Sequence, residues 1–497
     1  MLLALSFPKF GHPAVAWVAL VPLLVALRGE RARTSPLHAW TLGLVTGLVS
    51  FAGTVYWTVD VMVVYGGVSR PVATPVAGLL VAYLALYPAA FAVGIHFAGR
   101  RLGRRVALIA PAVWVTTEWA RAHLLTGFPW VLLGYSQVSV MPIAQVASLF
   151  GVYGLSALVV AVNGALAYAV SVGWRRALPV VATVAAVMVA ATAWGSWRVA
   201  RGTLLAGGTS LDVGIVQGNV EQDRKWDPTS AAEILTRHLA LSREVAAQGV
   251  RLIVWPESST PFTFEAHPPS TTAIRDTAVA TGTWMLFGSN QVEVGEPPRY
   301  YNAAFLVDQT GATAGVYRKM HLVPFGEYVP LRRVLFFVAP LVEGVSDFSA
   351  GQALTLLPVQ GRPVSVAICY EVVFPHLVRD AVRRGSQLLV TLTNDAWYGT
   401  SSAPFQHFEQ ARLRAIEQGR YLVRAANTGI SGIVDPYGRV VVQSPLFEPR
   451  TLVGQVRLLG GLTVYGRIGD SFAWACAAVT LWLLLNGWRS ARAPGRS

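Results

Sequence analysis

The sequence predicts a polytopic helical membrane protein into which one α/β domain is inserted. Of the 497 residues, 53% are hydrophobic and only 13% are charged, and the mean hydropathy is +0.47. Such a composition excludes a disordered chain and an ordinary soluble protein. Several apolar runs are long enough to cross a bilayer as helices, and a polar region of alternating strand and helix patterns separates the last run from the others.

The membrane segments are defined by apolar runs of about 20 residues, the length that crosses a bilayer as a helix. These runs lie near residues 12–28, 37–58, 73–98, 106–122, 151–173, 177–195 and 467–488. We therefore expect transmembrane helices over 1–200 and a C-terminal transmembrane helix over 467–488. Residues 1–7 are apolar but too short to span, and we interpret them as a truncated first span, so that seven or eight spans are both compatible with the sequence.

The net charge of +14 is explained by membrane topology and does not indicate nucleic-acid binding. Arginines cluster after the first, third, fifth and last apolar runs, whereas the loops near 59–72 and 123–150 carry few basic residues. Arginine-rich loops stay in the cytoplasm. The polar region is therefore expected on the outer side of the membrane.

The loop over 123–150 is neither a good span nor a polar loop, because it contains Phe128-Pro129-Trp130 and Gly134-Tyr135-Ser136-Gln137. Aromatic residues prefer the bilayer interface. The loop is expected to be an interfacial platform or a re-entrant connector, and the sequence leaves both open. In the run before it, Glu118 and Arg121 are spaced to pair on one helix.

The polar region over 210–458 has the pattern of a single α/β domain. Short apolar strands are expected at 211–217, 252–255, 284–288, 303–307, 364–368 and 388–392, and helices near 229–247, 270–281, 375–384 and 405–426. Alternating strands and helices indicate an α/β fold of ordinary domain size. Functional residues in such folds gather just past the strand ends.

Three short segments of this domain carry groups suited to one chemistry. Glu257 follows Trp255-Pro256, Lys319 lies in Tyr317-Arg318-Lys319-Met320-His321, and Cys369 precedes Tyr370-Glu371. A carboxylate base, a cation and a thiol are what acyl transfer through a thioester requires. Taken singly, they could be a solvated carboxylate, a surface lysine and a buried structural cysteine. Only Cys476 accompanies Cys369, so neither a disulfide framework nor a cysteine-rich zinc site is expected.

The flanking sequences strengthen this interpretation through a resemblance. The strings Trp255–Glu257, Arg318–Glu327 and Cys369–Glu371 resemble the Glu–Lys–Cys motifs of the nitrilase superfamily. The strings Lys319–Pro330 and Thr393–Gly399 resemble its membrane branch, the apolipoprotein N-acyltransferase family. That resemblance implies an α-β-β-α sandwich of nitrilase type for 210–458.

The resemblance also implies roles for single residues. Cys369 matches the nucleophile, Glu257 the general base and Lys319 the transition-state stabiliser. Further matches to supporting or pocket-lining positions are Glu327, Tyr370, Glu371, Asn394, Trp397 and Trp226. Trp226 is the loosest of them, because it fits an amphipathic anchor equally well.

The activity implied is transfer of a fatty acyl chain from a phospholipid, through a thioester on Cys369, to the α-amino group of the diacylglyceryl-cysteine that begins an apolipoprotein. One covalent intermediate serving two substrates predicts ping-pong kinetics. The expected partners are the phospholipid donor, the lipoprotein acceptor and the membrane, with no nucleic acid, metal or cofactor. We expect a monomer in the bacterial inner membrane, with its catalytic domain on the periplasmic side.

Two other functions remain compatible with the sequence. A membrane-tethered nitrilase-type amidase would hydrolyse a small amide with the same residues, and a transporter or scaffold would carry an inactive outer domain. The segment Leu331–Val342, with two arginines and two phenylalanines, is expected to be an amphipathic arm in the bilayer interface or else a buried helix.

Overall fold

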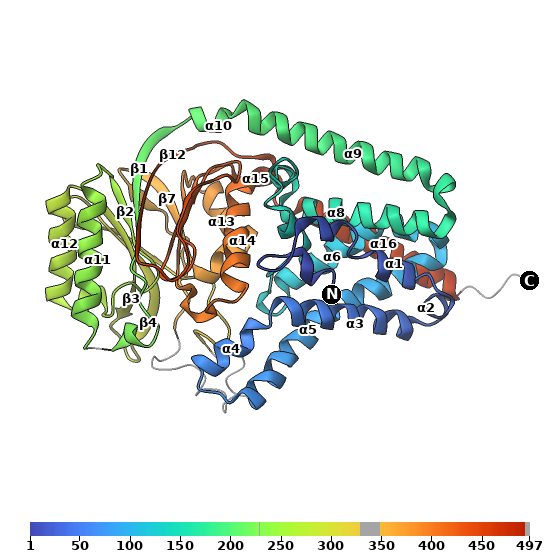
Figure 1. Ribbon diagram of the computed structural model, residues 1–497, viewed down its shortest axis with the longest axis horizontal. Coiled ribbons are helices and arrows are strands. Elements are labelled where there is room, and N and C mark those ends of the chain that lie inside the picture. The colour runs from blue at the N-terminus through green and yellow to red at the C-terminus, as the bar shows by residue number, and fades with distance from the viewer. Residues whose placement is uncertain (228, 329–347, 493–497) are drawn as a thin grey trace, which may run out of the picture. The chain divides into compact units, whose positions relative to one another are not determined.

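The computed structural model of the protein describes residues 1–227, 229–328 and 348–492. The arm predicted at 331–342 lies outside these residues. The chain divides into two compact units (Figure 1). The helical unit comprises Met1–Asp60, Ser69–Arg201 and Arg467–Ser497, and the α/β unit comprises Val61–Val68 and Gly202–Gly466.

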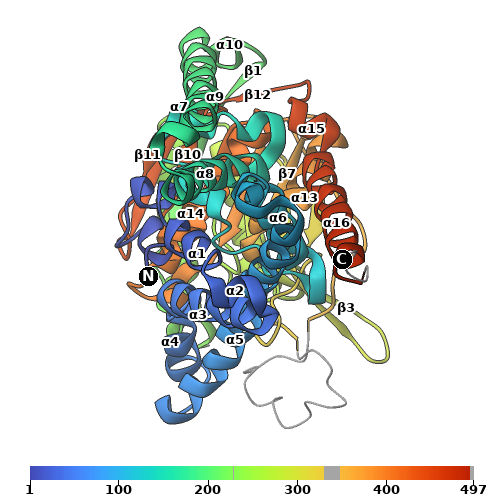
Figure 2. The same ribbon diagram turned by 90° about the vertical axis from the view of Figure 1, so that its right-hand side faces the viewer.

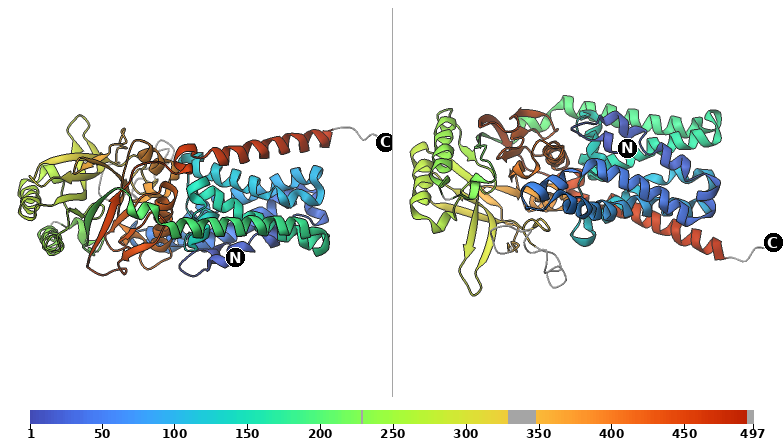
Figure 3. Two further views of the ribbon diagram at one scale, coloured as in Figure 1. Left: turned by 90° about the horizontal axis from the view of Figure 1, so that it is seen from above. Right: turned by 60° about the horizontal axis from the view of Figure 1, so that its bottom comes forward.

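The helical unit is built from long apolar helices and short connecting turns. Its helices are α1 Val21–Ala26, α2 Glu30–Thr34, α3 Pro36–Thr54, α5 Arg70–Leu102, α6 Ala110–His123, α7 Met141–Ala144, α8 Ala147–Val172, α9 Trp174–Arg201 and α16 Ser471–Arg492. Two more elements, α4 Trp57–Val64 and α15 Val464–Ile468, cross the division between the units. The long helices run alongside one another, as Figure 2 shows nearly end-on, and α9 and α16 lie on opposite sides of the unit (Figure 3).

Four helices of the described chain are long and apolar enough to cross a membrane. They cover Pro36–Thr54, Arg70–Leu108, Ala147–Val172 and Trp174–Ala206, and two shorter apolar helices cover Pro13–Ala26 and Ser471–Asn486. The run predicted at 106–122 forms the shorter helix α6. The apolar residues at the N-terminus form a 3₁₀ turn at Ala4–Ser6.

Small residues let α3 and α5 pack closely. Gly43 and Gly47 are one turn apart on α3 and face Ala85 and Ala89 of α5, and a Cβ placed on Gly47 would lie 2.6 Å from the Cα of Ala85. Close backbone approach at small residues is a common basis of helix association in membranes, where apolar side chains gain little by leaving lipid.

Buried polar groups hold the irregular parts of this unit. Asn163 of α8 accepts from the amide of Leu20 (2.8 Å) and donates to the carbonyl of Ala16 (2.9 Å), which satisfies backbone groups near the start of α1. Such satisfaction is required where a chain breaks its helix in an apolar surround.

The loop after α6 is held by Glu118 and Arg121 of that helix. Arg121 donates to the carbonyl of Trp130 (2.7 Å), and Glu118 accepts from the amide of Leu133 (2.6 Å). Residues 130–138 are buried within the unit. The Glu118 and Arg121 side chains therefore bind the loop to α6, and the platform and connector interpretations both stay predictions.

The α/β unit contains two six-stranded sheets. The first has the order β12-β1-β2-β3-β4-β5, and the second has the order β11-β10-β9-β8-β7-β6. The strands of the first sheet are β1 Thr209–Gln217, β2 Leu252–Val254, β3 Trp284–Glu293, β4 Arg299–Val307, β5 Thr313–Arg318 and β12 Arg450–Leu458. Those of the second are β6 Leu357–Val359, β7 Arg362–Ile368, β8 Leu389–Thr393, β9 Leu422–Ala426, β10 Gly432–Val434 and β11 Val440–Gln443.

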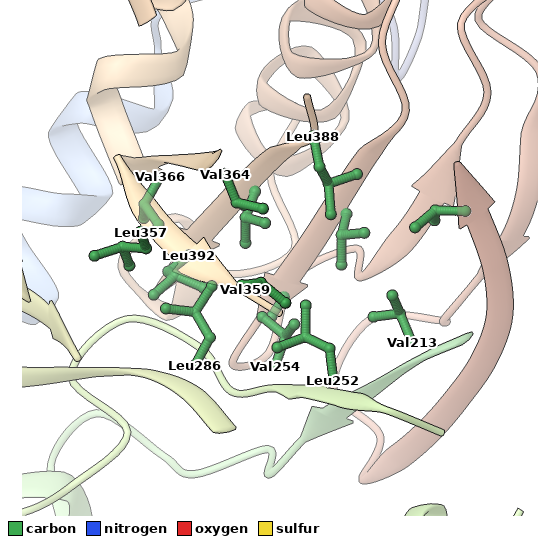
Figure 4. Packing of buried hydrophobic residues seen from close by; sticks show 14 of the residues in the cluster. Val213, Leu252, Val254, Leu286, Leu357, Val359, Val364, Val366, Leu388 and Leu392 are labelled. Carbon is green, nitrogen blue, oxygen red and sulfur yellow. The ribbon is translucent and has the colours of Figure 1, made fainter. Parts of the chain in front are cut away.

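The two sheets pack face to face between two layers of helices, which confirms the predicted α-β-β-α sandwich. The helices of the unit are α10 Thr203–Ala206, α11 Ala231–Ala246, α12 Pro268–Thr281, α13 Pro375–Arg383 and α14 Ala403–Gln418. Helices α11 and α12 cover the first sheet, and α13 and α14 cover the second (Figure 1). Between the sheets, Val254 and Leu286 of the first meet Leu357 and Leu392 of the second in a buried core (Figure 4).

One helix prediction was too long. The pattern over 405–426 is a helix only to Gln418, because Gly419 takes the left-handed conformation (φ 61°) that ends helices. Residues Leu422–Ala426 then form the fully buried strand β9, parallel to β8. A short apolar run after a helix reads as its continuation, since periodicity alone does not separate a buried strand from a buried helix.

Candidate active site

The three predicted catalytic residues each follow a strand. Glu257 lies just after β2, Lys319 directly after β5 and Cys369 directly after β7. Strands β2 and β3 are parallel, while β4 runs against both β3 and β5, so β2 and β5 end at the same edge of the first sheet. This topology brings Glu257 and Lys319 together from positions 62 residues apart.

The chain changes direction sharply at Cys369, where strand β7 ends. Cys369 has φ 51°, which is unusual for a residue with a side chain, and it begins the 3₁₀ turn Cys369–Val373. Strained conformations of this kind cluster at functional sites. Beside Glu257 the chain passes so close to β3 that a Cβ on Gly288 would lie 2.7 Å from the Glu257 Cα. Glycine is therefore required there.

Glu257, Lys319 and Glu327 form a buried ionic network, which we call the lysine network. The Lys319 ammonium lies 2.9 Å from Glu327 Oε1 and 3.5 Å from Glu257 Oε1. Asn302 of β4 donates to the same two oxygens, at 2.7 Å to Glu257 and 2.9 Å to Glu327. The amide of Val323 donates to the other Glu327 oxygen at 2.8 Å. The network therefore contains two carboxylates around one ammonium.

The charges of this network set the state of the lysine and the thiol. Burial alone would lower the pKa of Lys319, but Glu327 and Glu257 outweigh it and raise that pKa above its usual value. Burial raises the pKa of the Cys369 thiol, the Glu257 charge raises it further, and Lys319 opposes both. Lys319 thus favours the thiolate, as the sequence predicts, but the resting thiol keeps its proton and needs a base.

Glu371 ties the lysine segment to the cysteine turn. Its Oε1 accepts from the Tyr317 hydroxyl (2.8 Å) and the Met320 amide (2.7 Å), and its Oε2 accepts from the Ile368 amide (2.7 Å). The side chain is only 1% exposed. Burial raises the pKa of Glu371, while these backbone donors lower it. The residue therefore supports the site by joining the ends of β5 and β7.

Amide side chains fix the segment that leads to the predicted pocket residue Trp226. The backbone N–H of Asn394 donates to Glu257 Oε2 (2.9 Å). The side-chain amide of Asn394 donates to the Gln222 side chain (2.6 Å). Asn427 binds both the amide and the carbonyl of Val220, at 2.9 and 2.7 Å. Trp226 ends the following 3₁₀ turn, Arg224–Trp226.

A second buried network, which we call the histidine network, lies behind the cysteine. Asp395 contacts the Arg424 guanidinium (2.8 Å) and His407 Nδ1 (3.0 Å), and all three side chains are fully buried. His407 Nε2 lies 3.2 Å from the carbonyl oxygen of Cys369. Burial and the Arg424 charge lower the pKa of His407. The ring lies within hydrogen-bonding distance of Asp395 through Nδ1 and of the Cys369 carbonyl through Nε2, and an Arg424 guanidinium nitrogen also lies 3.0 Å from Nδ1.

The remaining predicted residues are aromatic. Trp397 is 38% exposed, and its ring lies edge-on to Tyr65 at 4.9 Å. Tyr65 belongs to the α/β unit, although it comes from the loop between α4 and α5, and its hydroxyl donates to the Ala396 carbonyl (2.8 Å). Tyr370 is buried and packs edge-on against Phe374. The structure thus puts Tyr370 in the cysteine turn and Trp397 at an exposed position.

Sequence reasoning missed several residues of this site. Asn302, His407 and Tyr65 lie 45, 38 and 331 residues from the groups they contact. The strand pattern around Asn302 could have predicted its place at the sheet edge near Glu257. The sequence contains no spacing or motif that predicts the contacts of His407 or Tyr65. In residues 1–227, 229–328 and 348–492, no group of three or more histidine, cysteine or acidic side chains is placed to hold a metal ion.

A thiol, a carboxylate and a lysine ammonium at the strand ends of an α-β-β-α sandwich are the groups expected of a carbon-nitrogen hydrolase. The Carbon-nitrogen hydrolase family model matches residues 212–460. The Apolipoprotein N-acyltransferase N-terminal domain model matches residues 1–165. The chain belongs to the apolipoprotein N-acyltransferase family.

Named relatives match along nearly the whole chain. An apolipoprotein N-acyltransferase of Geobacter metallireducens is 42% identical over 483 residues, covering 96% of this chain and 92% of the relative. Another, of Methylococcus capsulatus, is 37% identical, covering 95% and 91%. An amidase of the nitrilase superfamily from Nesterenkonia is 21% identical, with a TM-score of 0.41, covering 54% of this chain and 97% of that structure. With its candidate membrane helices, this chain is a bacterial membrane enzyme.

Proposed function

We propose that the protein transfers a fatty acyl chain from a phospholipid to the α-amino group of the N-terminal diacylglyceryl-cysteine of an apolipoprotein. The observation that carries this proposal is the meeting of Glu257 and Lys319 beside the buried, turned-out Cys369, in a chain of this family. The relatives are named apolipoprotein N-acyltransferase.

In the first half-reaction Glu257 takes the thiol proton, and the Cys369 sulfur attacks the ester carbonyl carbon of the phospholipid. The oxyanion that forms is stabilised by the Lys319 ammonium and by the backbone N–H of Tyr370. A donor of this kind contributes about 3 kcal/mol in comparable sites. Collapse breaks the ester bond, Glu257 returns its proton to the lysophospholipid alkoxide, and an acyl thioester remains on Cys369.

In the second half-reaction the lipoprotein amine attacks the thioester carbon and Glu257 takes a proton from it. Collapse breaks the carbon–sulfur bond and regenerates Cys369, with the proton of Glu257 returned to sulfur. The product is an amide. Because the first product leaves before the acceptor reacts, ping-pong kinetics are expected.

The experiment that tests this proposal is intact-mass spectrometry of the full-length protein incubated with phospholipid alone. Wild type should gain one acyl mass that hydroxylamine removes. Cys369→Ser should gain no hydroxylamine-labile mass, and Cys476→Ser, which alters the chain's other cysteine, should behave as wild type. Labile mass on Cys369→Ser, or none on wild type under turnover conditions, would refute the thioester.

The acceptor is tested by adding a diacylglyceryl-cysteine peptide to the acylated protein. The acyl group should move to the peptide with a free α-amine and stay on the enzyme with the N-acetylated peptide. Equal discharge to water in both cases would instead favour the membrane-tethered amidase.

We also propose an inner-membrane location with the α/β unit on the periplasmic side, because the arginine-rich loops belong to the cytoplasm. Val294, in the hairpin between β3 and β4, is 96% exposed. In a Cys369→Ser/Cys476→Ser background, Val294→Cys should react with a membrane-impermeant maleimide in intact spheroplasts. Arg104→Cys, in an arginine-rich loop, should react only after lysis. The reverse pattern would invert the topology, and the monomeric state stays a prediction.

A further inference from the structure

Lys225 is a second buried lysine beside Glu257. Its side chain is 3% exposed, and its ammonium donates to the backbone carbonyl oxygen of Glu257 at 3.1 Å. Among the described residues, this carbonyl is the one hydrogen-bond acceptor that the structure gives the ammonium. An ammonium has three N–H donors, and one neutral acceptor does not compensate a buried charge.

Hydrogen bonds to the segment before Lys225 fix the position of this residue. The preceding segment is held by Asn427, which binds Val220, and by Asn394, which binds Gln222. The amide of Lys225 then donates to the carbonyl of Glu221 at 3.1 Å. Asn394 also binds the Glu257 carboxylate, so the same contacts place Lys225 and Glu257 relative to each other.

The charges near Lys225 keep its ammonium protonated at neutral pH. Burial lowers the pKa of Lys225 to about 8, while the charges of Glu257 and Cys369 oppose this shift. The other titratable group that faces it is His238 of α11, which is buried and whose pKa burial lowers to about 4. His238 is therefore neutral above about pH 6 and leaves the lysine as the local charge.

The Cys369 thiol has more negatively charged than positively charged neighbours. Glu257 and Asp395 both interact with Cys369, and each carboxylate would oppose a negative charge on its sulfur. Lys319 is the cation that opposes them, but two carboxylates of the lysine network share it. A thiolate at Cys369 therefore calls for a second positive charge.

We propose that Lys225 is a positioning residue whose ammonium holds Glu257 in place and supplies the second positive charge that stabilises the Cys369 thiolate. The proposal rests on the proposed function, because it takes Cys369 as the nucleophile. The thiol proton passes to Glu257, and Lys225 keeps its own proton throughout. Loss of that proton in alkaline solution removes the stabilisation.

Alkylation of Cys369 by iodoacetamide tests this without any lipid. The thiolate displaces iodide and forms a carbon–sulfur bond, so the rate follows the thiolate fraction. In the full-length Cys476→Ser protein, we expect the logarithm of the rate to rise with pH and then to flatten near pH 8, where Lys225 loses its charge. A straight rise of tenfold per pH unit from 6.5 to 10 would overturn the proposal, whatever happens to the variants.

Substitutions sharpen the test. Lys225→Met should react about tenfold more slowly than wild type at pH 7, since a nearby charge shifts a pKa by about one unit or more. The difference should shrink to less than about twofold by pH 9, because wild-type Lys225 is then mostly neutral. Lys225→Arg should keep the fast rate above pH 9. Arg224→Met is the matched control, because Arg224 is exposed and pairs with Glu233, and its profile should equal that of wild type.

A constant ratio between Lys225→Met and wild type at every pH would indicate a merely structural effect and would overturn the proposal. The wild-type profile decides the matter if Lys225→Met fails to fold. The test is separate from the proposed function: absence of an acyl adduct with phospholipid would refute the transferase mechanism and leave the alkylation profile intact.

Discussion

The two buried ionic networks near Cys369 differ in charge balance and in exposure to solvent. The lysine network has two carboxylates around one ammonium, and the Glu257 and Glu327 side chains keep 9% and 12% of their surface exposed. The histidine network pairs one carboxylate with one guanidinium, and its side chains are fully buried. A network whose charges cancel and which solvent does not reach can only stabilise the structure around it. A network with excess negative charge that solvent reaches can exchange a proton with a substrate.

The largest expected effect comes from removing the carboxylate that we propose as the proton acceptor, Glu257 of the lysine network. Glu257→Gln should slow formation of the acyl adduct by about 10²–10⁴-fold, the usual contribution of a general base. Time-resolved intact-mass spectrometry measures the rate. Glu233→Gln, at an exposed carboxylate, should leave the rate unchanged. A wild-type rate in Glu257→Gln would transfer the base role to another group.

The next effect is on stability and comes from the histidine network. Arg424→Met leaves Asp395 buried without its counter-charge, and we expect a loss of about 3–5 kcal/mol. Thermal unfolding in detergent measures this loss as a lower apparent Tm. As a control, Arg224→Met removes one member of the exposed Arg224–Glu233 ion pair and should lower stability by less than about 1 kcal/mol.

A double variant decides whether the loss comes from the orphaned charge. Arg424→Met with Asp395→Leu should be more stable than Arg424→Met alone, because it removes both buried charges. If the second substitution lowers stability further by its full single-variant amount, the two side chains are not coupled and the description of a paired network is wrong.

A smaller effect is expected where the histidine network contacts Cys369. His407→Leu removes the donor to the Cys369 carbonyl, and an unsatisfied buried carbonyl costs about 1–3 kcal/mol. Since the turn at Cys369 is strained, we expect kcat to fall about tenfold with the KM for phospholipid unchanged. His407→Gln, which keeps an N–H donor, should recover part of the rate. A change confined to KM would contradict this positioning role.

The smallest effect separates the networks by pH. Burial alone would raise the pKa of Asp395, but Arg424 and His407 hold it well below its usual range. The folded state then binds fewer protons than the unfolded state in acid, so this stabilisation is present above about pH 4 and is lost as pH falls through the folded pKa. The pKa of Lys319 is raised, so its stabilisation is present below about pH 10.4 and is lost as pH rises further.

Apparent Tm measured across pH checks these signs. Asp395→Asn should flatten the fall of Tm at acid pH and leave the fall at alkaline pH unchanged. Lys319→Met should flatten the alkaline fall and leave the acid fall unchanged. Each fall should change by at most about 1.4 kcal/mol for every unit of pKa shift. An acid fall that persists in Asp395→Asn would assign it to other groups, of which the buried His238 is the first candidate.

Much of the fold followed from local patterns. The strands that begin at Leu252, Trp284 and Leu389 were predicted within a residue of their starts, because short apolar runs between turn residues are typical of buried parallel strands. The short strands β6, β10 and β11, each of three or four residues, were missed. Such strands are too short for a pattern, and their partners in the sheet define them.

The sequence by itself determined that the chain has long apolar helices and one α/β domain, and it predicted Glu257, Lys319 and Cys369 as catalytic residues, because hydrophobic length, periodicity and motif strings are local properties. Only the tertiary structure decided that Lys319 is shared by two carboxylates, that Lys225 approaches Glu257 and that His407 supports Cys369. The physical reason is that the pKa and position of a buried group depend on the neighbours that folding brings to it from distant parts of the chain.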